Sequence, residues 1–305
     1  MRRAAFFLGK GGVGKTTMSA AFSHELARAG KKVLVVSLDP AHNLGDVLSV
    51  DLGNEAIRVE AGLDALEVDL GAWVDRYLEE SRQELLSSYS YNLSINLDSI
   101  FNIMRYSPGT EEYAVLWAIE HVYCDLSADY DVVVYDTPPT ALSLRFLAMP
   151  SVSEIWVDEL SKLRERILNK RQVLTRINPS SPVASSCVDK ADDKVYGKLG
   201  AIRERLGALS RLFRDESYMS VVINPDRLSV SEALRIKDEL DRIHIPLKSV
   251  CVNKRGLSEA PWSPDSAFSS VPSFGFDFRP EGLHCLKDLE AFDIAALAAD
   301  FNSRD

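Results

Sequence analysis

The feature that most constrains the fold is a glycine-rich segment near the N-terminus, GKGGVGKTT at residues 9–17. It follows a short apolar run, residues 4–8, and opens a helical stretch, residues 15–29, that Gly30 ends. A strand, a glycine-rich loop and a helix in this order form the setting of the phosphate-binding P-loop motif. Glycines let backbone N–H groups converge on phosphate oxygens, and the helix N-terminus adds partial positive charge. The predicted phosphate-binding residues are Gly11, Gly12, Val13, Gly14, Lys15, Thr16 and Thr17.

Three side chains of this loop have expected roles in binding ATP and Mg²⁺. Lys15 is predicted to reach the β- and γ-phosphates, and the Thr16 hydroxyl is predicted to bind Mg²⁺. Thr17 is expected to contact the α-phosphate. ATP and Mg²⁺ are therefore the expected cofactors.

Five further apolar runs indicate that the loop belongs to a parallel sheet. Buried parallel strands are almost continuously apolar, and their alternation with helical stretches is typical of βαβ units. The predicted fold class is therefore α/β, a mostly parallel P-loop NTPase sheet with helices on both faces and an added helical layer. The runs are residues 33–38, 131–135, 219–223, 247–252 and 271–274.

Two longer helical regions, about 71–127 and 151–215, are expected to form a subdomain within a single P-loop domain that covers residues 1–305. Two stretches of the second region each carry an apolar face at helical spacing. Residues 178–186 (NPSSPVASS) between these stretches are predicted to be a flexible loop. The two faces consist of Trp156, Leu160, Leu163 and Ile167, and of Leu199, Ile202, Leu206, Leu209 and Phe213.

Composition excludes several classes of partner. The net charge of −10 argues against nucleic acid or anionic lipid as the main partner. The four cysteines include no C-x-x-C pair, which gives a zinc or redox site little support.

The apolar run after Arg3 is too short for a signal peptide, and no run is long enough to span a bilayer. The chain is expected to be cytoplasmic, with no direct membrane anchor.

A second motif, SLDPAHNLGD at residues 37–46, follows the second apolar run. With the P-loop, it resembles the first switch of the ArsA/Get family, which contains arsenite-pump ATPases and ATPases that target tail-anchored membrane proteins. The resemblance implies that Asp39 orients or deprotonates the attacking water, a task that suits a carboxylate at the end of a strand. The alternative is an Asp-Pro turn in which Asp39 caps a helix.

Lys10 is the early lysine that marks the deviant P-loop of this family. The resemblance implies a homodimer in which Lys10 reaches the partner's nucleotide and acts like an arginine finger. A solvated surface lysine is the alternative.

A third motif, DTPPTALSLR at residues 136–145, follows the strand DVVVY and resembles the family's second switch. It implies that Asp136 holds Mg²⁺ through water, together with Thr16.

Three weaker matches extend the resemblance: residues 108–112 (PGTEE), 225–232 (PDRLSVSE) and 252–254 (VNK). Family resemblance implies that Asn253 reads the adenine edge, whereas a turn-forming Asn after a strand is the alternative. Pro272 and Phe274 are predicted to line the base pocket, or else to belong to an ordinary core strand.

The chain also departs from the family. The family's Gly-His in the second switch is Ala141-Leu142 here, and a leucine cannot ligate As(III) or Sb(III). Cys124 and Cys187 are candidate thiol ligands, or small buried apolar residues. The C-x-x-C zinc clasp of the eukaryotic targeting factor is absent, and only Met104 and Met149 lie near an expected client groove.

The expected function is an ATP-hydrolysing homodimeric switch that couples Mg·ATP to a hydrophobic membrane-protein segment or a membrane transporter subunit. An arsenite-transporting pump subunit is one alternative. A MinD/ParA-like positioning ATPase is another, although residues 289–305 are acidic rather than a basic membrane helix. An iron–sulfur ATPase is excluded because residues 148–161 contain no cysteine.

Overall fold

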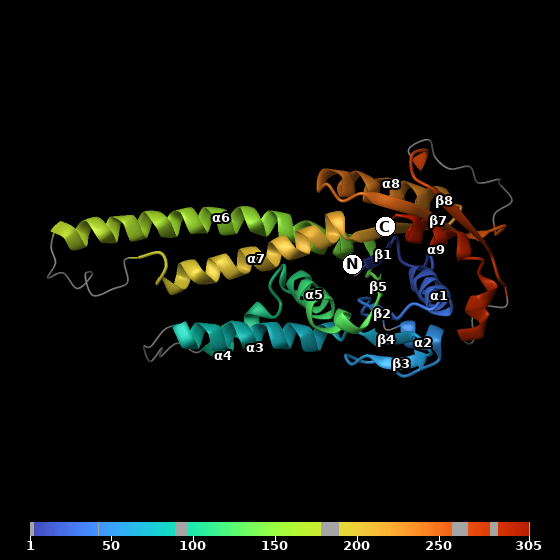
Figure 1. Ribbon diagram of the computed structural model, residues 1–305, viewed down its shortest axis with the longest axis horizontal. Helices are drawn as coiled ribbons and strands as arrows, with labels where there is room; N and C mark the ends of the chain where they lie inside the picture. The colour runs from blue at the N-terminus through green and yellow to red at the C-terminus, as the bar shows by residue number, and fades with distance from the viewer. Residues whose placement is uncertain are drawn as a thin grey trace. The chain divides into compact units, whose positions relative to one another are not determined.

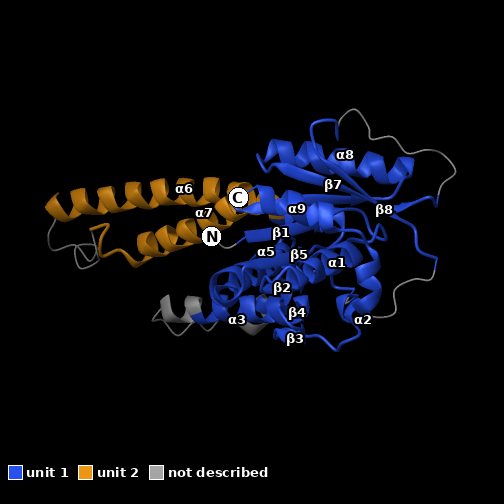
Figure 2. Ribbon diagram, turned by 45° about the vertical axis from the view of Figure 1, so that its right-hand side comes forward, with its two compact units in different colours: residues 1–146, 216–305 blue, residues 147–215 orange. Residues whose placement is uncertain are grey.

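The computed structural model describes residues 3–41, 43–88, 97–177, 189–257, 268–280 and 286–304. Its contacts divide the chain into two compact units (Figure 2). Unit 1 comprises Met1–Phe146 and Glu216–Asp305, and unit 2 comprises Leu147–Asp215. The second of the two expected helical regions thus forms its own unit, whereas the first is grouped with the sheet. The expected loop at residues 178–186 lies outside the described residues.

Unit 1 is built on a sheet that, within the described ranges, has eight strands in the order β3-β4-β2-β5-β1-β6-β7-β8 (Figure 1). Every neighbouring pair is parallel except β3 and β4, which are antiparallel. The predicted α/β class is therefore confirmed. The strands are β1 (Arg3–Leu8), β2 (Val33–Ser37), β3 (Ile57–Glu60), β4 (Leu63–Glu67), β5 (Val132–Asp136), β6 (Ser217–Ile223), β7 (Leu247–Arg255) and β8 (Ser273–Asp277).

The strands that the sequence predicts are all present, with ends that differ by a few residues. The two strands that it does not predict, β3 (IRVE) and β4 (LDALE), contain several charged residues and no continuous apolar run. They form the antiparallel end of the sheet, with β3 at its edge; Arg58 of β3 is exposed, whereas Glu67 of β4 is buried. Apolar continuity therefore identified the buried centre of the sheet and missed this edge.

Helix α1 (Lys15–Arg28) packs between the sheet and the C-terminal elements, the 3₁₀ helix Leu286–Ala291 and α9 (Ala295–Ser303). The layers meet through aromatic rings. Phe7 of β1 contacts Phe22 of α1 edge-on at 5.4 Å, and Phe22 contacts Phe301 of α9 at 5.3 Å. All three rings are fully buried, so the helix that follows the P-loop is fixed from both sides.

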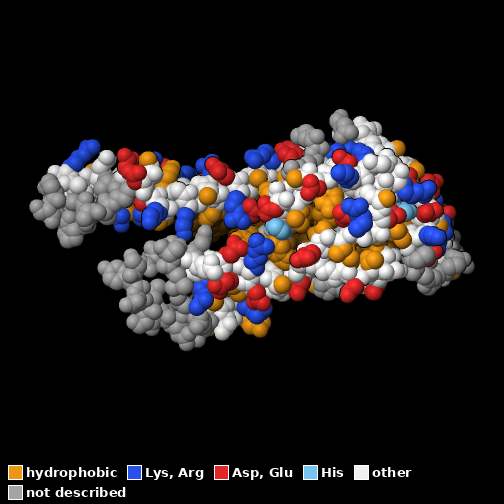
Figure 3. Space-filling model, turned by 60° about the horizontal axis from the view of Figure 1, so that its bottom comes forward, with side chains coloured by type: hydrophobic (Ala, Val, Ile, Leu, Met, Phe, Trp, Pro, Cys, Tyr) orange, Lys and Arg blue, Asp and Glu red, His pale blue; other side chains and the backbone are white. Residues whose placement is uncertain are grey.

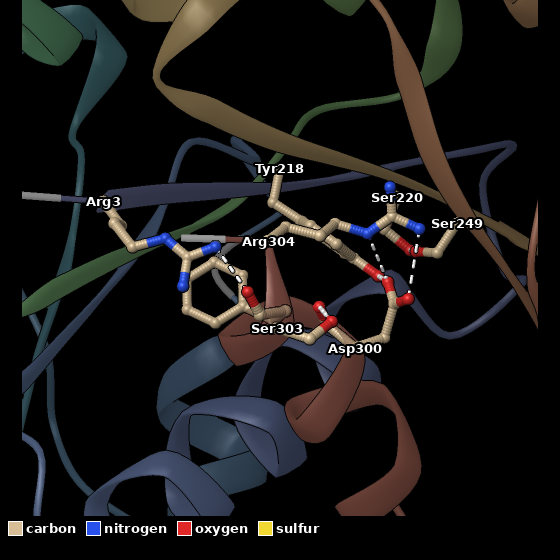
Figure 4. Close-up of polar contacts among 8 residues, drawn as sticks. Arg3, Tyr218, Ser220, Ser249, Asp300, Ser303 and Arg304 are labelled. Carbon is tan, nitrogen blue, oxygen red and sulfur yellow. Dashed lines mark hydrogen bonds and ion pairs between the residues drawn. The ribbon is translucent and has the colours of Figure 1, made fainter.

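Polar contacts also tie α9 to the sheet (Figure 4). The Tyr218 hydroxyl of β6 donates to Asp300 at 2.6 Å, and Arg304 donates to both oxygens of the same carboxylate at 2.8 and 3.1 Å. The Arg3 guanidinium lies 3.7 Å from the centre of the Phe301 ring and also donates to the Phe301 carbonyl. The last described helix is therefore part of the core of unit 1.

Replacing Phe301 with alanine should lower the free energy of unfolding by about 3 kcal/mol, because it removes a buried ring and leaves a cavity beside Phe22 and Tyr218. Urea denaturation followed by circular dichroism measures the change. Ser303→Ala on the exposed side of α9 is the matched control. A loss below about 1 kcal/mol for Phe301→Ala would show that α9 is not part of the core.

Three helices of unit 1 follow the edge strands: α3 (Leu70–Ser88), α4 (Leu97–Met104) and α5 (Thr110–His121). Tyr77 of α3 stacks on Tyr113 of α5 with ring centres 6.0 Å apart and meets Trp117 edge-on at 5.3 Å. The chain continues from α5 through a π-helical turn, Val122–Leu126, and a 3₁₀ turn, Ser127–Asp129, into β5. These elements join the edge of the sheet to its centre.

Unit 2 contains most of α6 (Thr140–Ile177) and α7 (Lys194–Asp215), which lie side by side. Polar contacts join the two segments: Arg164 donates to both carboxylate oxygens of Asp193, just before α7, at 3.0 and 2.6 Å, and Ser210 donates to Glu154 at 2.9 Å. Leu206, Leu209 and Phe213 of the predicted α7 face are buried, whereas Ile202 is exposed.

The remaining elements are α2 (Leu44–Leu48), between β2 and β3, and α8 (Arg227–Arg242), between β6 and β7. Asp226 caps α8 by accepting a hydrogen bond from the backbone N–H of Ser229 at 2.8 Å. No helix in the described ranges combines the length and the apolar character that crossing a membrane requires.

Candidate nucleotide site

The segment 9–17 forms a loop between β1 and α1, and two of its glycines are required by close neighbours. A Cβ on Gly9, whose φ is +147°, would lie 2.5 Å from the Val222 carbonyl oxygen. A Cβ on Gly14, whose φ is +97°, would lie 2.3 Å from the side-chain nitrogen of Asn253. A Cβ on Gly11 or Gly12 would meet no atom within 4 Å. The loop is thus packed against β6 and β7 on one side and open on the other, as a phosphate cradle requires.

Lys15 begins α1, and its side chain is almost fully buried. Burial lowers the pKa of its ammonium group, and the negative charges of Asp136 and Asp39 oppose that shift. Its Nζ lies 3.5 Å from the backbone carbonyl of Lys10. The structure therefore brings the predicted phosphate lysine and both predicted switch carboxylates into one electrostatic cluster. The Lys10 side chain itself is exposed.

Asp136, at the end of β5, is the buried acid of this cluster. The Thr16 hydroxyl donates to its Oδ2 at 2.7 Å, and among the described residues its buried Oδ1 has no hydrogen-bond partner. Burial raises the pKa of Asp136 to about 7, although the Thr16 hydrogen bond and the Lys15 charge act in the opposite direction. A buried carboxylate with an unpartnered oxygen, beside a threonine hydroxyl, fits the oxygen donors that Mg²⁺ takes.

The raised pKa predicts how Mg²⁺ binding depends on pH. An ionised Asp136 is needed to hold a cation, and a pKa of about 7 leaves this group largely protonated in mild acid. The apparent Mg²⁺ affinity of the nucleotide complex should therefore rise by about tenfold between roughly pH 6 and pH 8. Isothermal titration calorimetry across that range measures it. Asp136→Asn corrects for titration of the nucleotide itself, and an equal pH slope in both proteins would exclude Asp136 as the cause.

Asp39 follows β2 and is half-buried. Its Oδ1 accepts a hydrogen bond from the Ala41 N–H at 3.1 Å, the short-range turn contact that the alternative interpretation describes. The charge of Asp39 nevertheless acts on Lys15. A role of Asp39 toward water therefore stays a prediction, and His42 lies outside the described residues.

Glu67 at the end of β4 contacts the same switch segment. Its buried carboxylate accepts the N–H groups of Leu44 at 2.8 Å and of Gly45 at 3.0 Å, at the start of α2. Negative charge at a helix N-terminus is favourable, so Glu67 holds the first switch against the sheet. Sequence reasoning missed this residue because it missed β4. The available signal was a carboxylate at the end of a short alternating run, LDALE.

The second switch is anchored in two ways. The Thr137 hydroxyl donates to the Phe7 carbonyl of β1 at 2.7 Å, and both residues are buried. Arg145 forms an ion pair with Glu112 at 2.7 Å, and the Glu112 carboxylate is almost fully buried. Glu112 belongs to the PGTEE segment, so two motifs that lie apart in the sequence meet in the structure.

Asn253 and Lys254, at the end of β7, contact backbone carbonyl groups of the P-loop. Asn253 Nδ2 donates to the Val13 carbonyl at 2.8 Å, and Lys254 Nζ donates to the Gly12 carbonyl at 3.1 Å. Phe274 lies in β8 and packs against the hydrophobic core, and Pro272 precedes that strand. Recognition of adenine by Asn253, Pro272 and Phe274 stays a prediction. Sequence reasoning missed Lys254, although it directly follows the asparagine.

The parallel sheet, the glycine-rich loop ahead of α1 and the acid at the end of the neighbouring strand define a P-loop ATPase. A family model described as an anion-transporting ATPase, ArsA_ATPase, matches residues 2–269. The chain therefore belongs to the ArsA_ATPase family, as the sequence motifs predicted, and it is an ATPase.

Curated relatives carry names from both branches of this family. A protein of Aquifex aeolicus (strain VF5) named "Putative arsenical pump-driving ATPase 2" is 29% identical over 252 residues, which cover 83% of this chain and 80% of that protein. The "ATPase get3" of Pyrenophora tritici-repentis (strain Pt-1C-BFP) is 32% identical over 261 residues, covering 83% of this chain and 73% of that protein.

The cysteines and Leu142 bear on the arsenite alternative. Cys124 is exposed in the π-helical turn, Cys251 is buried in β7, and Cys187 and Cys285 lie outside the described residues. Leu142 is half-buried in the first turn of α6. Within the ranges that the structure describes, no group of three or more His, Cys, Asp or Glu side chains is placed to hold a metal ion.

Proposed function

We propose that this ATPase is a homodimeric switch that couples Mg·ATP binding and hydrolysis to binding of a hydrophobic segment of a membrane protein. The observation that carries the proposal is a stripe of exposed apolar side chains along α6, the same helix that begins in the second switch. We call it the apolar stripe. It consists of Val152, Ile155, Trp156, Leu160, Leu163, Val173, Leu174 and Ile177.

Helix α6 carries apolar side chains on two sides: Val157 and Leu168 are buried, whereas the side chains of the stripe are exposed. Two polar residues of α6 also make contacts away from the stripe: Glu154 accepts a hydrogen bond from Ser210 of α7, and Arg164 donates to Asp193, just before α7. On a helix with about 3.6 residues per turn, Glu154, Val157 and Leu168 lie on the side away from the stripe. The stripe itself is open to water, with Trp156 67% and Ile177 75% exposed. Large apolar side chains exposed along one side of a helix favour a binding site, which supports the proposal.

The length of the stripe favours a transmembrane helix as its ligand. The stripe has two parts, residues 152–163 and 173–177, which together span about 37 Å at a rise of roughly 1.5 Å per residue. A transmembrane helix has an apolar length of about 30 Å, so one such segment could lie along the stripe. On the face drawn in Figure 3, positive and negative side chains are interspersed rather than grouped by sign. That pattern, like the net charge of −10, favours an apolar partner over nucleic acid.

Coupling would pass along α6. The helix starts at Thr140, four residues after Asp136, and continues into unit 2. Pro150 lies inside it and cannot donate the helical hydrogen bond to Phe146, the last residue of unit 1 before the boundary. A proline at that point favours bending there. A movement of the second switch at the phosphate site would therefore act directly on the helix that carries the stripe.

In the proposed site, Lys15 would neutralise phosphate charge and Asp39 would orient water. Lys10 of each chain would reach its partner's nucleotide. Mg²⁺, held through Thr16 and Asp136, would supply charge stabilisation to the phosphates.

The test is binding of a fluorescent transmembrane-helix peptide, solubilised in detergent, to the full chain, followed by anisotropy with ADP and with a non-hydrolysable ATP analogue and Mg²⁺. We expect an affinity that differs between the two nucleotides and that falls at least about tenfold in Trp156→Glu and Leu163→Glu. Lys194→Gln on α7, which makes the same change in net charge away from the stripe, is the control. Equal affinity in all variants would contradict the proposal.

A parallel arm adds Sb(III) in the ATPase assay. Stimulation by Sb(III) without peptide binding would replace the proposal with the arsenite-pump alternative, which the name of the Aquifex relative represents.

A further inference from the structure

Two consecutive residues at the end of β7 hold two consecutive carbonyl groups of the P-loop. Asn253 Nδ2 donates to the Val13 carbonyl at 2.8 Å, and Lys254 Nζ donates to the Gly12 carbonyl at 3.1 Å. The strand and the loop are more than 200 residues apart in sequence, so this pairing is created only by the fold. Both residues lie where the regular pairing of β7 with β8 breaks.

The backbone at this point is shaped to bring both side chains to the loop. Pairing of β7 with β8 shifts register between Val252 and Arg255, which is the signature of a bulge. Bulges commonly lie beside active sites, where they redirect side chains. Lys254 has a φ of +55°, in the left-handed region that residues with a Cβ seldom occupy. The Asn253 side chain stabilises this turn, since its Oδ1 accepts the Lys254 N–H at 2.9 Å.

A lysine in the left-handed conformation has a higher conformational energy than a glycine, which adopts that conformation without strain. The chain does use glycine two residues later, where Gly256 has a φ of +83°. Strained backbone of this kind is concentrated at functional sites. The side chain of Lys254 therefore has a role that glycine could not supply, and its ammonium group donates a hydrogen bond to the P-loop.

Peptide geometry shows what that role is. In a planar trans peptide the C=O and the following N–H point in opposite directions. The Gly12 carbonyl shares its peptide with the Val13 N–H, and the Val13 carbonyl shares its peptide with the Gly14 N–H. Holding both carbonyls toward β7 thus turns both N–H groups away from β7, toward the open side of the loop. P-loops bind phosphate through N–H groups directed in this way.

We propose that Lys254 is a positioning residue of the phosphate site, which orients the Val13 and Gly14 N–H groups toward the nucleotide by holding the Gly12 carbonyl beside Asn253. Its ammonium group also adds positive charge next to the loop that begins at Gly9. The proposal rests on residues 9–17 being the phosphate site and is independent of what the apolar stripe binds.

The variants separate the ammonium group from the backbone. Lys254→Met keeps the length of the side chain and removes the donor. Lys254→Gly removes the side chain and relieves the left-handed strain, and Lys254→Arg keeps a cationic donor. Lys248→Met, in the same strand, removes a half-buried lysine that has no described contact with the P-loop. Affinities for ATP, ADP and adenosine are measured by competition against a fluorescent ADP, and thermal unfolding is recorded for every variant.

We expect Lys254→Met and Lys254→Gly to bind ATP and ADP roughly tenfold more weakly, because a hydrogen bond from a charged donor is lost. Adenosine binding should change less than about twofold, because it has no phosphate for the loop to hold. Lys254→Arg should recover most of the affinity, Lys248→Met should match the wild type, and Lys254→Gly should unfold at the wild-type temperature or above.

Two results would overturn the proposal: wild-type affinity for ATP and ADP in Lys254→Met, or an equal loss of adenosine and ADP binding. Failure of the phosphate-site assignment itself is distinguishable, because Lys15→Ala would then retain ATP binding. If the apolar stripe does not bind a hydrophobic helix, the peptide assay will show no binding, and these nucleotide affinities will be unaffected.

Discussion

Lys10→Ala is expected to lower kcat for ATP hydrolysis by about 10³-fold or more while ATP binding stays near the wild-type level. Within its own chain the Lys10 side chain is exposed, and it is the backbone carbonyl of Lys10 that contacts Lys15. Its ammonium group is therefore available to another chain. A cation supplied in this way neutralises charge that develops only as the phosphoryl group leaves, so its loss affects kcat rather than binding. Steady-state kinetics and nucleotide titration measure the two quantities separately.

Mixing two inactive variants shows whether Lys10 acts across a dimer. Lys15→Ala should not bind ATP well, but it can still supply Lys10 to a partner. A mixture of Lys10→Ala and Lys15→Ala should therefore recover up to about a quarter of wild-type activity, since half of randomly formed dimers are mixed and each contains one complete site. No recovery over a range of ratios, or full activity of Lys10→Ala alone, would mean that Lys10 has no role in the partner's site.

The second large effect is expected at Asp39. Asp39→Asn should lower kcat by about 10²- to 10⁴-fold, the range associated with loss of a general base or of a residue that orients water. Asparagine can still accept the hydrogen bond from the Ala41 N–H, so the local turn should persist. The variant thus separates the chemical role of the carboxylate from its role as a turn cap.

Single-turnover hydrolysis with prebound ATP is the measurement for Asp39, because it excludes changes in binding. Asp46→Asn, an exposed carboxylate in the same motif, is the control and should retain activity within about threefold. If Asp39→Asn hydrolyses ATP at the wild-type rate, the turn interpretation is sufficient and the base must be sought elsewhere.

The centre of the fold and the core of the site could be predicted from the sequence because their signals are local. For apolar runs such as DVVVY and for the glycine-rich loop before α1, a few neighbouring residues are enough to predict the structure. Lys15, Thr16, Asp39 and Asp136 each follow such a run directly. The carboxyl ends of parallel strands meet at one edge of a sheet, so the structure brings these residues together.

The supporting contacts could not be predicted because they depend on pairing between distant segments. Glu67 holds the first switch only because β4 lies beside β2, and β4 has no continuous apolar run. Arg145 and Glu112 each belong to a motif, but nothing in either motif indicates that they form an ion pair. Lys254 reaches Gly12 through a bulge, whose position is set by the pairing of β7 with β8.

The apolar stripe shows a different limit. The helical spacing of Trp156, Leu160 and Leu163 was visible in the sequence, but such a pattern is normally the buried face of a helix. In the structure α6 buries Val157 and Leu168 on its other side and adds the ion pair of Arg164 with Asp193 there. Periodicity identified the face correctly, and only the structure shows that it is exposed.

The central claim is that the site is completed by a second chain when ATP and Mg²⁺ bind. Light scattering coupled to size exclusion tests it most directly, with the full chain in the absence of nucleotide, with ADP, and with a non-hydrolysable ATP analogue and Mg²⁺. The account predicts the mass of two chains with the ATP analogue, and loss of that effect in Lys15→Ala. The mass of one chain in every state, together with full ATPase activity, would contradict it.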